Sequence, residues 1–316
     1  MINVAALGFG TVGSGVVELI DMNKKHIASK LENELNVKYI LDIRDFPGHE
    51  LEKCFTKDFN DILNDDDVRV VIETAGGATF AYDYVKACLL KGKSVVTSNK
   101  EVVSNFGTEL CKTAAENGVR YLFEASTGGA IPALTPIAQC LSANRISRIA
   151  GILNGTTNFI LTKMISDGMN FDEALLLAQK NGYAERDPSA DVDGHDACRK
   201  ICILAALCFG KHVYPDYVHT EGIRNIALSD VEYARAWGGV IKLLGRAKRV
   251  GDKISAMVSP AFVADTSILS GVNDVFNSVF VRGNAVGDVA FYGRGAGKLA
   301  TASACVADVI DCARHL

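Results

Sequence analysis

Short apolar runs alternate with amphipathic segments over the first 130 residues of the chain. The apolar runs predict β-strands at residues 2–7, 37–43, 68–73, 94–97 and 119–124. The amphipathic segments predict helices at residues 14–31, 82–91 and 109–117. Because strands that alternate with helices form right-handed βαβ units, this half of the chain is expected to form a mostly parallel, doubly wound α/β sheet.

The second half of the chain mixes helical and β-rich segments, a pattern typical of an α+β domain with an antiparallel sheet. Helices are expected at residues 156–166, 172–181, 195–208 and 297–315, strands at 147–153, 256–264 and 278–283, and a mixed segment at 231–250. We therefore expect a first domain at residues 1–130 and a second at 131–296. The last helix, about 297–316, is expected to pack back on the first domain, and a cleft is expected between the two domains.

Composition narrows the class of protein. Hydrophobic residues make up 48% and charged residues 22% of the chain, which excludes a disordered, collagen-like or coiled-coil protein. The formal net charge of −4 offers no basic field for nucleic acid or anionic lipid, and no apolar run is long enough to span a bilayer. The nine cysteines form no Cys-x-x-Cys pair. We therefore expect a cytoplasmic protein without nucleic-acid or membrane partners.

A glycine-rich turn follows the first predicted strand and opens the first predicted helix. Its sequence, Gly8-Phe9-Gly10-Thr11-Val12-Gly13, has the spacing of a Rossmann-type dinucleotide-binding turn, in which a pyrophosphate lies on the helix N-terminus. After the second strand come Asp42, which would accept from the ribose 2′-OH of NAD, and Arg44, which would pair with the 2′-phosphate of NADP. NADP and NAD both remain open, with NADP slightly favoured.

Two lysines lie where ligand chemistry is expected. Lys100 follows the strand at 94–97, at the sheet edge where ligands of parallel sheets bind, although a solvated surface lysine is the alternative. Lys200 follows the densest acidic segment, 185–196, and shares one helix face with Asp196, four residues earlier. Carboxylates beside a lysine can bind a substrate ammonium while the amine moves a proton. The alternatives are a capped helix start and an EF-hand loop, and the latter fails because Lys200 occupies the position of the closing Glu.

The chain resembles the homoserine dehydrogenase family almost from end to end. The matching motifs are GFGTVG at 8–13, TSNKEVVS at 97–104, FEASTGGAIPAL at 123–134, GILNGTTNFIL at 151–161, GYAERDPSADVDGHDACRK at 182–200 and FYGRGAGKLATASAC at 291–305. The resemblance implies an NAD(P)-dependent oxidoreductase that interconverts L-homoserine and L-aspartate 4-semialdehyde in threonine, methionine and isoleucine biosynthesis. It further implies a homodimer, in a short form that lacks the family's C-terminal regulatory ACT domain.

The resemblance also implies roles for individual residues. Lys200 would exchange the hydroxyl proton, and Lys100 would be a second lysine beside the reacting centre and the cofactor. The implied substrate contacts are Glu185, Asp191, Asp196 and Thr156. Cofactor contacts besides the glycine turn are expected at Arg44, Thr74, Gly182, Gly295 and Gly297. A monovalent cation, Na⁺ or K⁺, would be held by Glu124, Thr127, Gly129 and Ile131, and the alternative for Glu124 is a buried carboxyl paired with a lysine.

Two other functions are compatible with parts of the sequence. Another Rossmann-fold reductase of amino-acid semialdehydes or imines would share the glycine turn, but the 182–200 segment argues against it. A dinucleotide-sensing regulator would need a DNA-binding element, and the sequence has no basic helix.

Overall fold

The computed structural model describes residues 1–316, which divide into two compact units. The first unit comprises Met1–Ala130 and Gly297–Leu316, and the second comprises Ile131–Ala296. The end of the chain therefore belongs to the same unit as its beginning. No helix combines the length and the apolar character needed to cross a membrane.

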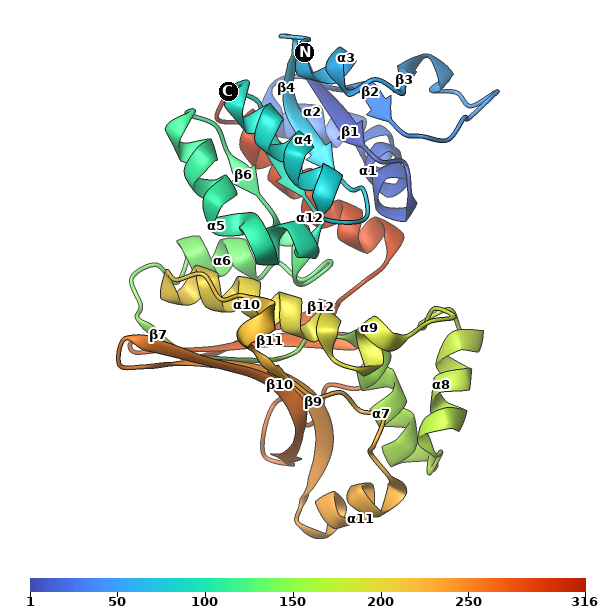
Figure 1. The fold of residues 1–316 in the computed structure, drawn as a ribbon, viewed down its shortest axis with the longest axis vertical. Coiled ribbons are helices and arrows are strands. Elements are labelled where there is room, and N and C mark those ends of the chain that lie inside the picture. Colours follow the sequence, from blue (N-terminus) through green and yellow to red (C-terminus); the bar gives the residue numbers. More distant parts are fainter. The chain divides into compact units, whose positions relative to one another are not determined.

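A six-stranded parallel sheet forms the centre of the first unit, in the order β3-β2-β1-β4-β5-β6 (Figure 1). Its strands are β1 (Ile2–Leu7), β2 (Leu35–Leu41), β3 (Phe55–Thr56), β4 (Val68–Glu73), β5 (Ser94–Thr97) and β6 (Tyr121–Leu122). The strand order reverses between β1 and β4, which confirms the doubly wound α/β class. Ligands of such sheets bind beyond the carboxyl ends of the strands at this reversal point.

The helices of the first unit are α1 (Thr11–Met22), α2 (Lys24–Leu31), α3 (Phe59–Leu63), α4 (Thr79–Leu90), α5 (Lys100–Glu116) and α12 (Lys298–Ala313). Apolar residues of α1, α2 and α12 share one hydrophobic core with alternate residues of β1, β4 and β5. The chain's last helix thus fills a place on the first sheet, against α1. A 3₁₀ turn at Glu52–Cys54 precedes β3.

The strand expected at 37–43 and the helix expected at 82–91 are shifted by one to three residues, and three other expected elements of the first unit differ more. The helix expected at 14–31 is two helices, divided at Asn23. The helix expected at 109–117 begins at Lys100, because the Asn99 side chain accepts from the amides of Glu101 and Val102 and caps it. The strand expected at 119–124 is only two residues long, and a 3₁₀ turn, Glu124–Ser126, follows it.

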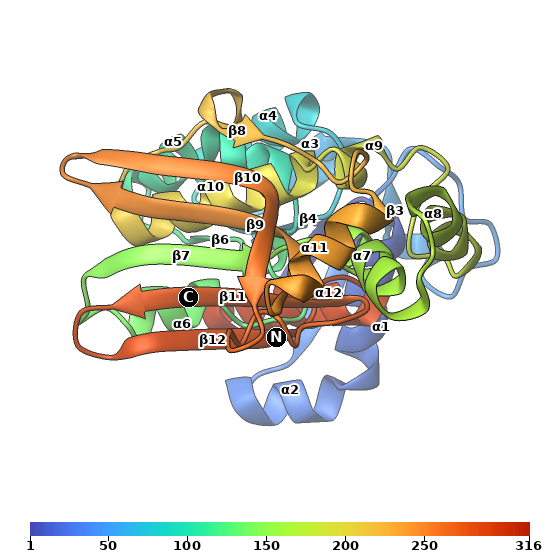
Figure 2. The ribbon, with the colours of Figure 1, turned by 90° about the horizontal axis from the view of Figure 1, so that it is seen from below.

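A second six-stranded sheet, in the order β12-β11-β7-β9-β10-β8, forms the centre of the second unit (Figure 2). Its strands are β7 (Ile146–Ile152), β8 (His219–Thr220), β9 (Gly239–Val250), β10 (Lys253–Ala264), β11 (Phe276–Gly283) and β12 (Gly287–Arg294). All neighbouring strands are antiparallel except β8 and β10. The sequence pattern did not indicate β12, because this strand has no fully buried residue and therefore no apolar run.

The helices of the second unit are α6 (Leu134–Gln139), α7 (Gly155–Asp167), α8 (Phe171–Lys180), α9 (Ser189–Val192), α10 (His195–Phe209) and α11 (Leu228–Ala236), with a 3₁₀ turn at Pro215–Tyr217. Helix α10 packs on β9 and β10. The mixed segment expected at 231–250 is the end of α11 followed by β9, divided at Gly238, whose φ of 74° is left-handed. Figure 2 shows α11 across one end of the sheet.

A fully buried lysine joins α7, β9 and the segment before β11. Lys242 on β9 donates to the carbonyl of Val272 at 2.5 Å and to the amide oxygens of Asn158 and Asn273 at 3.3 and 3.1 Å. Asn158 in turn donates to the carbonyls of Val272, Asp274 and Phe276. Burial lowers the pKa of Lys242 to about 8. The lysine thus holds the 272–276 segment against α7, the helix that carries the NGTT motif.

We expect Lys242→Met to lower the free energy of unfolding by about 1–3 kcal/mol, because buried acceptors on three residues then lose their donor. Denaturant unfolding of the purified protein measures the change. The matched control is Lys248→Met, since Lys248 is exposed on the same strand. It should alter the free energy by no more than about 0.5 kcal/mol. Equal stability of the two variants would show that the buried network contributes nothing.

Candidate active site

The glycine turn lies between β1 and α1, at the reversal point of the first sheet. Gly8 has a left-handed φ of 94°, and a Cβ on Gly13 would lie 2.0 Å from the Gly8 carbonyl oxygen, so the backbone requires both glycines. A Cβ on Gly10 would meet no atom within 4 Å. No side chain caps the first turn of α1 at Gly10, so its amides are available to an anion. This open, donor-rich turn fits a dinucleotide pyrophosphate.

Thr74 fixes the turn from the neighbouring strand. Its Oγ1 donates towards the carbonyl oxygens of Gly8, at 3.0 Å, and of Leu7, at 3.2 Å. The turn is therefore tied to the end of β4 as well as to β1. Its support of the turn follows from these two contacts, and its contact with the cofactor stays a prediction.

Asp42 and Arg44 both lie at the tip of β2 and bind each other. The Asp42 carboxylate accepts from the Phe9 amide at 2.8 Å, and from the Arg44 amide, Nε and Nη2 at 2.9 to 3.0 Å. The hydrogen bonds from Arg44 lower the pKa of Asp42 to about 2. The Asp42 side chain is 7% exposed, whereas the Arg44 side chain is 56% exposed. Both carboxylate oxygens are therefore occupied, while the guanidinium faces outwards.

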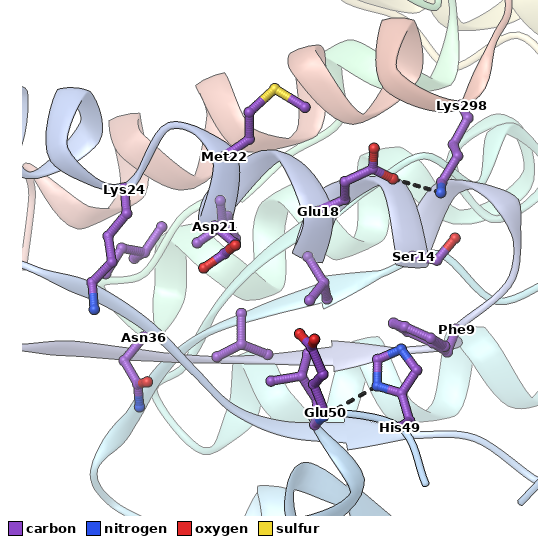
Figure 3. A pocket seen from close by; sticks show the side chains of 15 residues that line it. Phe9, Ser14, Glu18, Asp21, Met22, Lys24, Asn36, His49, Glu50 and Lys298 are labelled. Atoms are coloured by element: carbon purple, nitrogen blue, oxygen red, sulfur yellow. Dashed lines mark hydrogen bonds and ion pairs between the residues drawn. The ribbon is translucent and has the colours of Figure 1, made fainter. Parts of the chain in front are cut away.

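Two pockets adjoin the turn. One, of about 390 Å³, is lined by the cations Arg44 and Lys57 and by the acids Asp42, Asp45 and Glu52. Arg44 is paired with Asp42, and Lys57 is paired with Asp45 at 2.6 Å. The other, of about 540 Å³, lies between α1, β2 and the 49–51 segment, and the Glu18–Lys298 ion pair lies at one side of it (Figure 3). The Phe9 ring makes edge contacts with His49, Phe46 and Phe55, which anchor the turn through its side chain.

Lys200 and Asp196 form a buried ion pair on α10. The Lys200 Nζ lies 2.7 Å from Asp196 Oδ2 and donates to the Leu153 carbonyl at 2.8 Å. Only 8% of Lys200 and 5% of Asp196 is exposed. The ion pair expected from the i,i+4 spacing therefore forms. Because an ammonium has three donors and two of these have protein partners, the third is available to a substrate oxygen.

Asn154, which the sequence analysis did not select, links the two aspartates of this site. Its Nδ2 donates to Asp191 Oδ1 at 2.7 Å and to Asp196 Oδ2 at 2.9 Å. Its Oδ1 accepts from the Thr157 amide at 2.8 Å and caps α7. The sequence does contain a signal for Asn154, because this residue is the first of the NGTT motif. Thr156 is the only residue of that motif that was expected to contact substrate.

Thr156 and Asp191 complete the same cluster. The Thr156 hydroxyl lies 2.7 Å from the Tyr183 carbonyl oxygen and 3.1 Å from Asp191 Oδ2. Burial and then the nearby charge of Asp196 raise the pKa of Asp191. The structure thus brings together Lys200, Asp196, Asp191 and Thr156, four of the residues expected at a substrate site.

Glu185 lies in the loop that precedes α9. Its side chain is exposed, and only its carbonyl has a partner there, Gln179 Nε2 at 3.0 Å. No hydrogen bond or ion pair joins the Glu185 carboxylate to Asp196 or Lys200 in the structure. The contact of Glu185 with a substrate stays a prediction.

Three further glycines are expected to contact the cofactor, and each lies where its backbone conformation or a close neighbour disfavours a side chain. Gly182, in an exposed turn, has a φ of 74°, and Gly297, before α12, has a φ of 135°. A Cβ on Gly295 would lie 1.9 Å from the side-chain Nδ2 of Asn277. Their contacts with the cofactor stay predictions.

The 124–131 segment offers one carboxylate and several backbone carbonyls. Glu124, Thr127 and Ile131 are buried, and Gly129 has a φ of 59°. The structure contains no cluster of three His, Cys, Asp or Glu that could hold a metal ion. A single carboxylate with carbonyl oxygens suits a weakly bound monovalent cation better than a transition metal.

Comparison with known proteins decides the family. A family model described as homoserine dehydrogenase matches residues 132–310, and one described as homoserine dehydrogenase, NAD binding domain, matches residues 8–124. The chain belongs to the homoserine dehydrogenase family. A homoserine dehydrogenase of Synechocystis sp. is 43% identical over 317 residues, which cover 98% of this chain and 73% of that relative.

Solved structures of the family have the same fold. A homoserine dehydrogenase from Thiobacillus denitrificans matches with a TM-score of 0.93 and 38% identity, over 99% of this chain and 73% of that one. A hyperthermophilic archaeal homoserine dehydrogenase mutant in complex with NADPH matches with a TM-score of 0.84 and 28% identity, over 98% and 97% of the two chains. This homoserine dehydrogenase family member is thus an oxidoreductase with a nicotinamide dinucleotide-binding domain, as the sequence analysis expected.

We expect Gly10→Val to weaken cofactor binding at least about tenfold while the fold is retained, because the new side chain enters open space that the pyrophosphate needs. Titration of NADPH fluorescence measures the affinity. Gly271→Val is the matched control, since a Cβ there also meets nothing within 4 Å, but in the second unit. Unchanged affinity in a folded Gly10→Val protein would remove the turn from the cofactor site.

We expect Lys200→Ala to lower kcat about a hundredfold or more, with NADPH affinity little changed, because the site then lacks its proton donor. Steady-state kinetics in both directions measure the effect. Lys163→Ala is the control, since Lys163 forms an i,i+4 ion pair with Asp167 on α7 that is more exposed. A Lys200→Ala protein whose kcat lies within about threefold of that of the unaltered protein would exclude Lys200 as the general acid–base group.

Proposed function

We propose that this chain interconverts L-homoserine and L-aspartate 4-semialdehyde with NADP(H), and that Lys200 exchanges the hydroxyl proton. The observation that carries the proposal is the buried Lys200–Asp196 pair, linked through Asn154 to Asp191. The cluster presents one ammonium donor without a protein partner and two carboxylates that both accept from Asn154 Nδ2. A short amino acid with a hydroxyl or aldehyde group matches that set of charges.

The chain's residues have distinct roles in this reaction. Bound nicotinamide supplies or accepts the hydride. In the reduction direction, the third N–H of Lys200 protonates the oxygen that was the aldehyde, and the same amine accepts that proton in the reverse direction. Asp191 and Asp196 attract the substrate ammonium, and Asn154 holds their carboxylates at a fixed separation. Thr156 orients Asp191, and Lys100 contacts the cofactor and the substrate at the edge of the first sheet.

The preference for NADP is supported by the tip of β2. Asp42, the acid that would favour NAD, already accepts from Phe9 and Arg44, whereas the Arg44 guanidinium is more than half exposed. The pocket beside it is lined by Lys57 but also by Asp45 and Glu52, and Lys57 is paired with Asp45. The NADP assignment therefore rests on Arg44, whose exposed guanidinium can pair with the ribose 2′-phosphate. The archaeal relative was solved with NADPH, which agrees with this assignment.

Three further properties belong to the proposal. A monovalent cation, Na⁺ or K⁺, is held by Glu124 and the carbonyls of Thr127, Gly129 and Ile131. Two copies of the chain form a homodimer through the second sheet, whose strands β7 and β12 carry the exposed residues Arg148 and Tyr292. The protein acts in the cytoplasm in amino-acid biosynthesis, for which the nine unpaired cysteines provide support.

A single assay tests the activity. Purified protein with L-homoserine and NADP should produce NADPH, and removal of either substrate should abolish the signal. The second candidate, reduction of another amino-acid semialdehyde or of an imine, is tested by a substrate panel in the same assay. If the protein turned over such a substrate faster than aspartate 4-semialdehyde, the proposed specificity would be overturned.

We expect Arg44→Ala to raise KM for NADP at least about tenfold and to change KM for NAD by less than about threefold, because only NADP carries the 2′-phosphate. Initial rates with each cofactor measure the ratio. Arg69→Ala is the matched control, since Arg69 is an exposed arginine on β4 of the same sheet. Equal changes for both cofactors would refute Arg44 as the residue that selects NADP.

A further inference from the structure

A carboxylate is completely buried at the end of β4, next to the cofactor-binding turn. Glu73 has an exposed fraction of 0%. Its Oε2 accepts from the Thr97 hydroxyl at 2.5 Å, its Oε1 lies 3.5 Å from Asn99 Nδ2, and the Ala75 amide donates to the same carboxyl group. No lysine, arginine or histidine forms an ion pair with it in the structure. Glu73 is therefore held by neutral donors from β5 and from the segment after β4.

Asn99 extends this contact to two segments at the sheet edge. Its Nδ2 donates to the carbonyls of Ala75, at 3.2 Å, and of Gly77, at 2.7 Å. Its amide donates to Thr97 Oγ1 at 2.9 Å, and its Oδ1 caps α5, whose first residue is Lys100. The Glu73 carboxylate is thus the common acceptor between the 74–77 segment and the start of α5.

Stability alone does not account for a carboxylate in this place. Burial raises the pKa of Glu73 from 4.5 to about 7, against the effect of its three hydrogen bonds. Because the folded protein then binds a proton more tightly than the unfolded chain, this group makes the fold less stable as pH rises from about 4.5 to 7. The ionised carboxylate therefore destabilises the fold. We attribute its presence to the geometry that it imposes on the 74–77 segment and on the start of α5.

We propose that Glu73 is a positioning residue that sets the separation of the 74–77 segment from the start of α5, and thereby the place of Lys100. The inference rests on the proposed function, in which Thr74 supports the cofactor turn and Lys100 contacts the cofactor. It adds a residue that touches neither cofactor nor substrate but acts through Thr97 and Asn99.

The first test replaces the carboxylate by its neutral isostere. Glu73→Gln keeps the shape but turns one acceptor into a donor that faces Thr97 or Asn99. We expect NADPH affinity and kcat each to fall about tenfold, which corresponds to one lost buried hydrogen bond. At alkaline pH the variant should be as stable as the unaltered protein or more so, because no buried charge remains. A purely structural role predicts the reverse, with lower stability and unchanged kinetics.

The second test approaches the same contact from β5. Thr97→Val removes the hydroxyl that donates to Glu73, and it should reproduce the loss of affinity. Ser94→Ala is the matched control, since Ser94 is a buried polar residue at the other end of the same strand, where its Oγ accepts from the Arg120 amide. The double variant Glu73→Gln/Thr97→Val should lose little more than either single variant, because both break one contact. Additive losses would contradict the proposal.

A pH profile separates positioning from packing. As pH falls through about 7, Glu73 gains a proton and one acceptor site becomes a donor, so KM for NADP should rise. This rise should be absent in Glu73→Gln. The nearby titratable groups are Tyr121 on β6 and Cys305 on α12, whose pKa values the Glu73 charge raises, and Lys100 and Glu101 on α5. The Tyr121 and Cys305 pKa values lie above the range tested. Burial raises the pKa of Asp308 on α12, whose charge also acts on Cys305, to about 7. A change in KM that persists in Glu73→Gln is therefore assigned to Asp308, and only the change that Glu73→Gln abolishes is assigned to Glu73.

The outcomes distinguish this inference from the proposed function. If the unaltered protein binds NADPH but does not oxidise homoserine, the proposed substrate is wrong, while the affinity and stability comparisons on Glu73 still stand. If the unaltered protein is active, and a folded Glu73→Gln protein matches it in affinity, kcat and pH profile, the positioning role of Glu73 is overturned. Should Glu73→Gln fail to fold, Thr97→Val against Ser94→Ala decides the same question.

Discussion

A buried ammonium needs partners, and the second unit is arranged around that requirement. The Lys200 side chain lies almost wholly inside the protein, where an unpaired charge would be prohibitively costly. Asp196 and the Leu153 carbonyl supply two partners, from one helix turn away and from the end of β7. Asn154 then satisfies the Asp196 and Asp191 oxygens and caps α7. The position of the amine is therefore fixed by a strand end, two helix starts and a short loop at once.

The first unit fixes its ligand-facing loops largely with neutral donors, which bind carbonyl and carboxylate oxygens. The glycine turn is held by Thr74 and by the Phe9 amide, which donates to Asp42. At the end of β4, at the same edge of the sheet, Glu73 accepts hydrogen bonds from Thr97 and Asn99. These contacts fix the loops that face the cofactor while leaving the α1 amides and the Nη1 of the exposed Arg44 guanidinium available. Rigid loops with free donors are what recognition of a pyrophosphate and a 2′-phosphate requires.

Both units place their reactive groups at the ends of regular elements. Lys100 is the first residue of α5, Lys200 lies in the second turn of α10, and the glycine turn opens α1. Helix starts offer unpaired amides and a positive dipole end, and they attract the polar residues that cap them. Asn99 and Asn154 are such caps, and each also joins a neighbouring loop to its helix. Each of these two asparagines therefore both caps its helix and holds a neighbouring loop, and its substitution would disturb both contacts.

The sequence alone determined the class of the first sheet, the glycine turn and the Asp196–Lys200 pair. These follow from local rules: strand and helix periods, the steric demands at Gly8 and Gly13, and a four-residue spacing on one helix. Only the tertiary structure decided that Asp42 is already occupied by Arg44 and that Asn154 joins two aspartates. It also decided that Glu73 links two loops. The physical reason is that these contacts join residues distant in sequence, or depend on the direction of a side chain, and neither leaves a period in the pattern of apolar and polar positions.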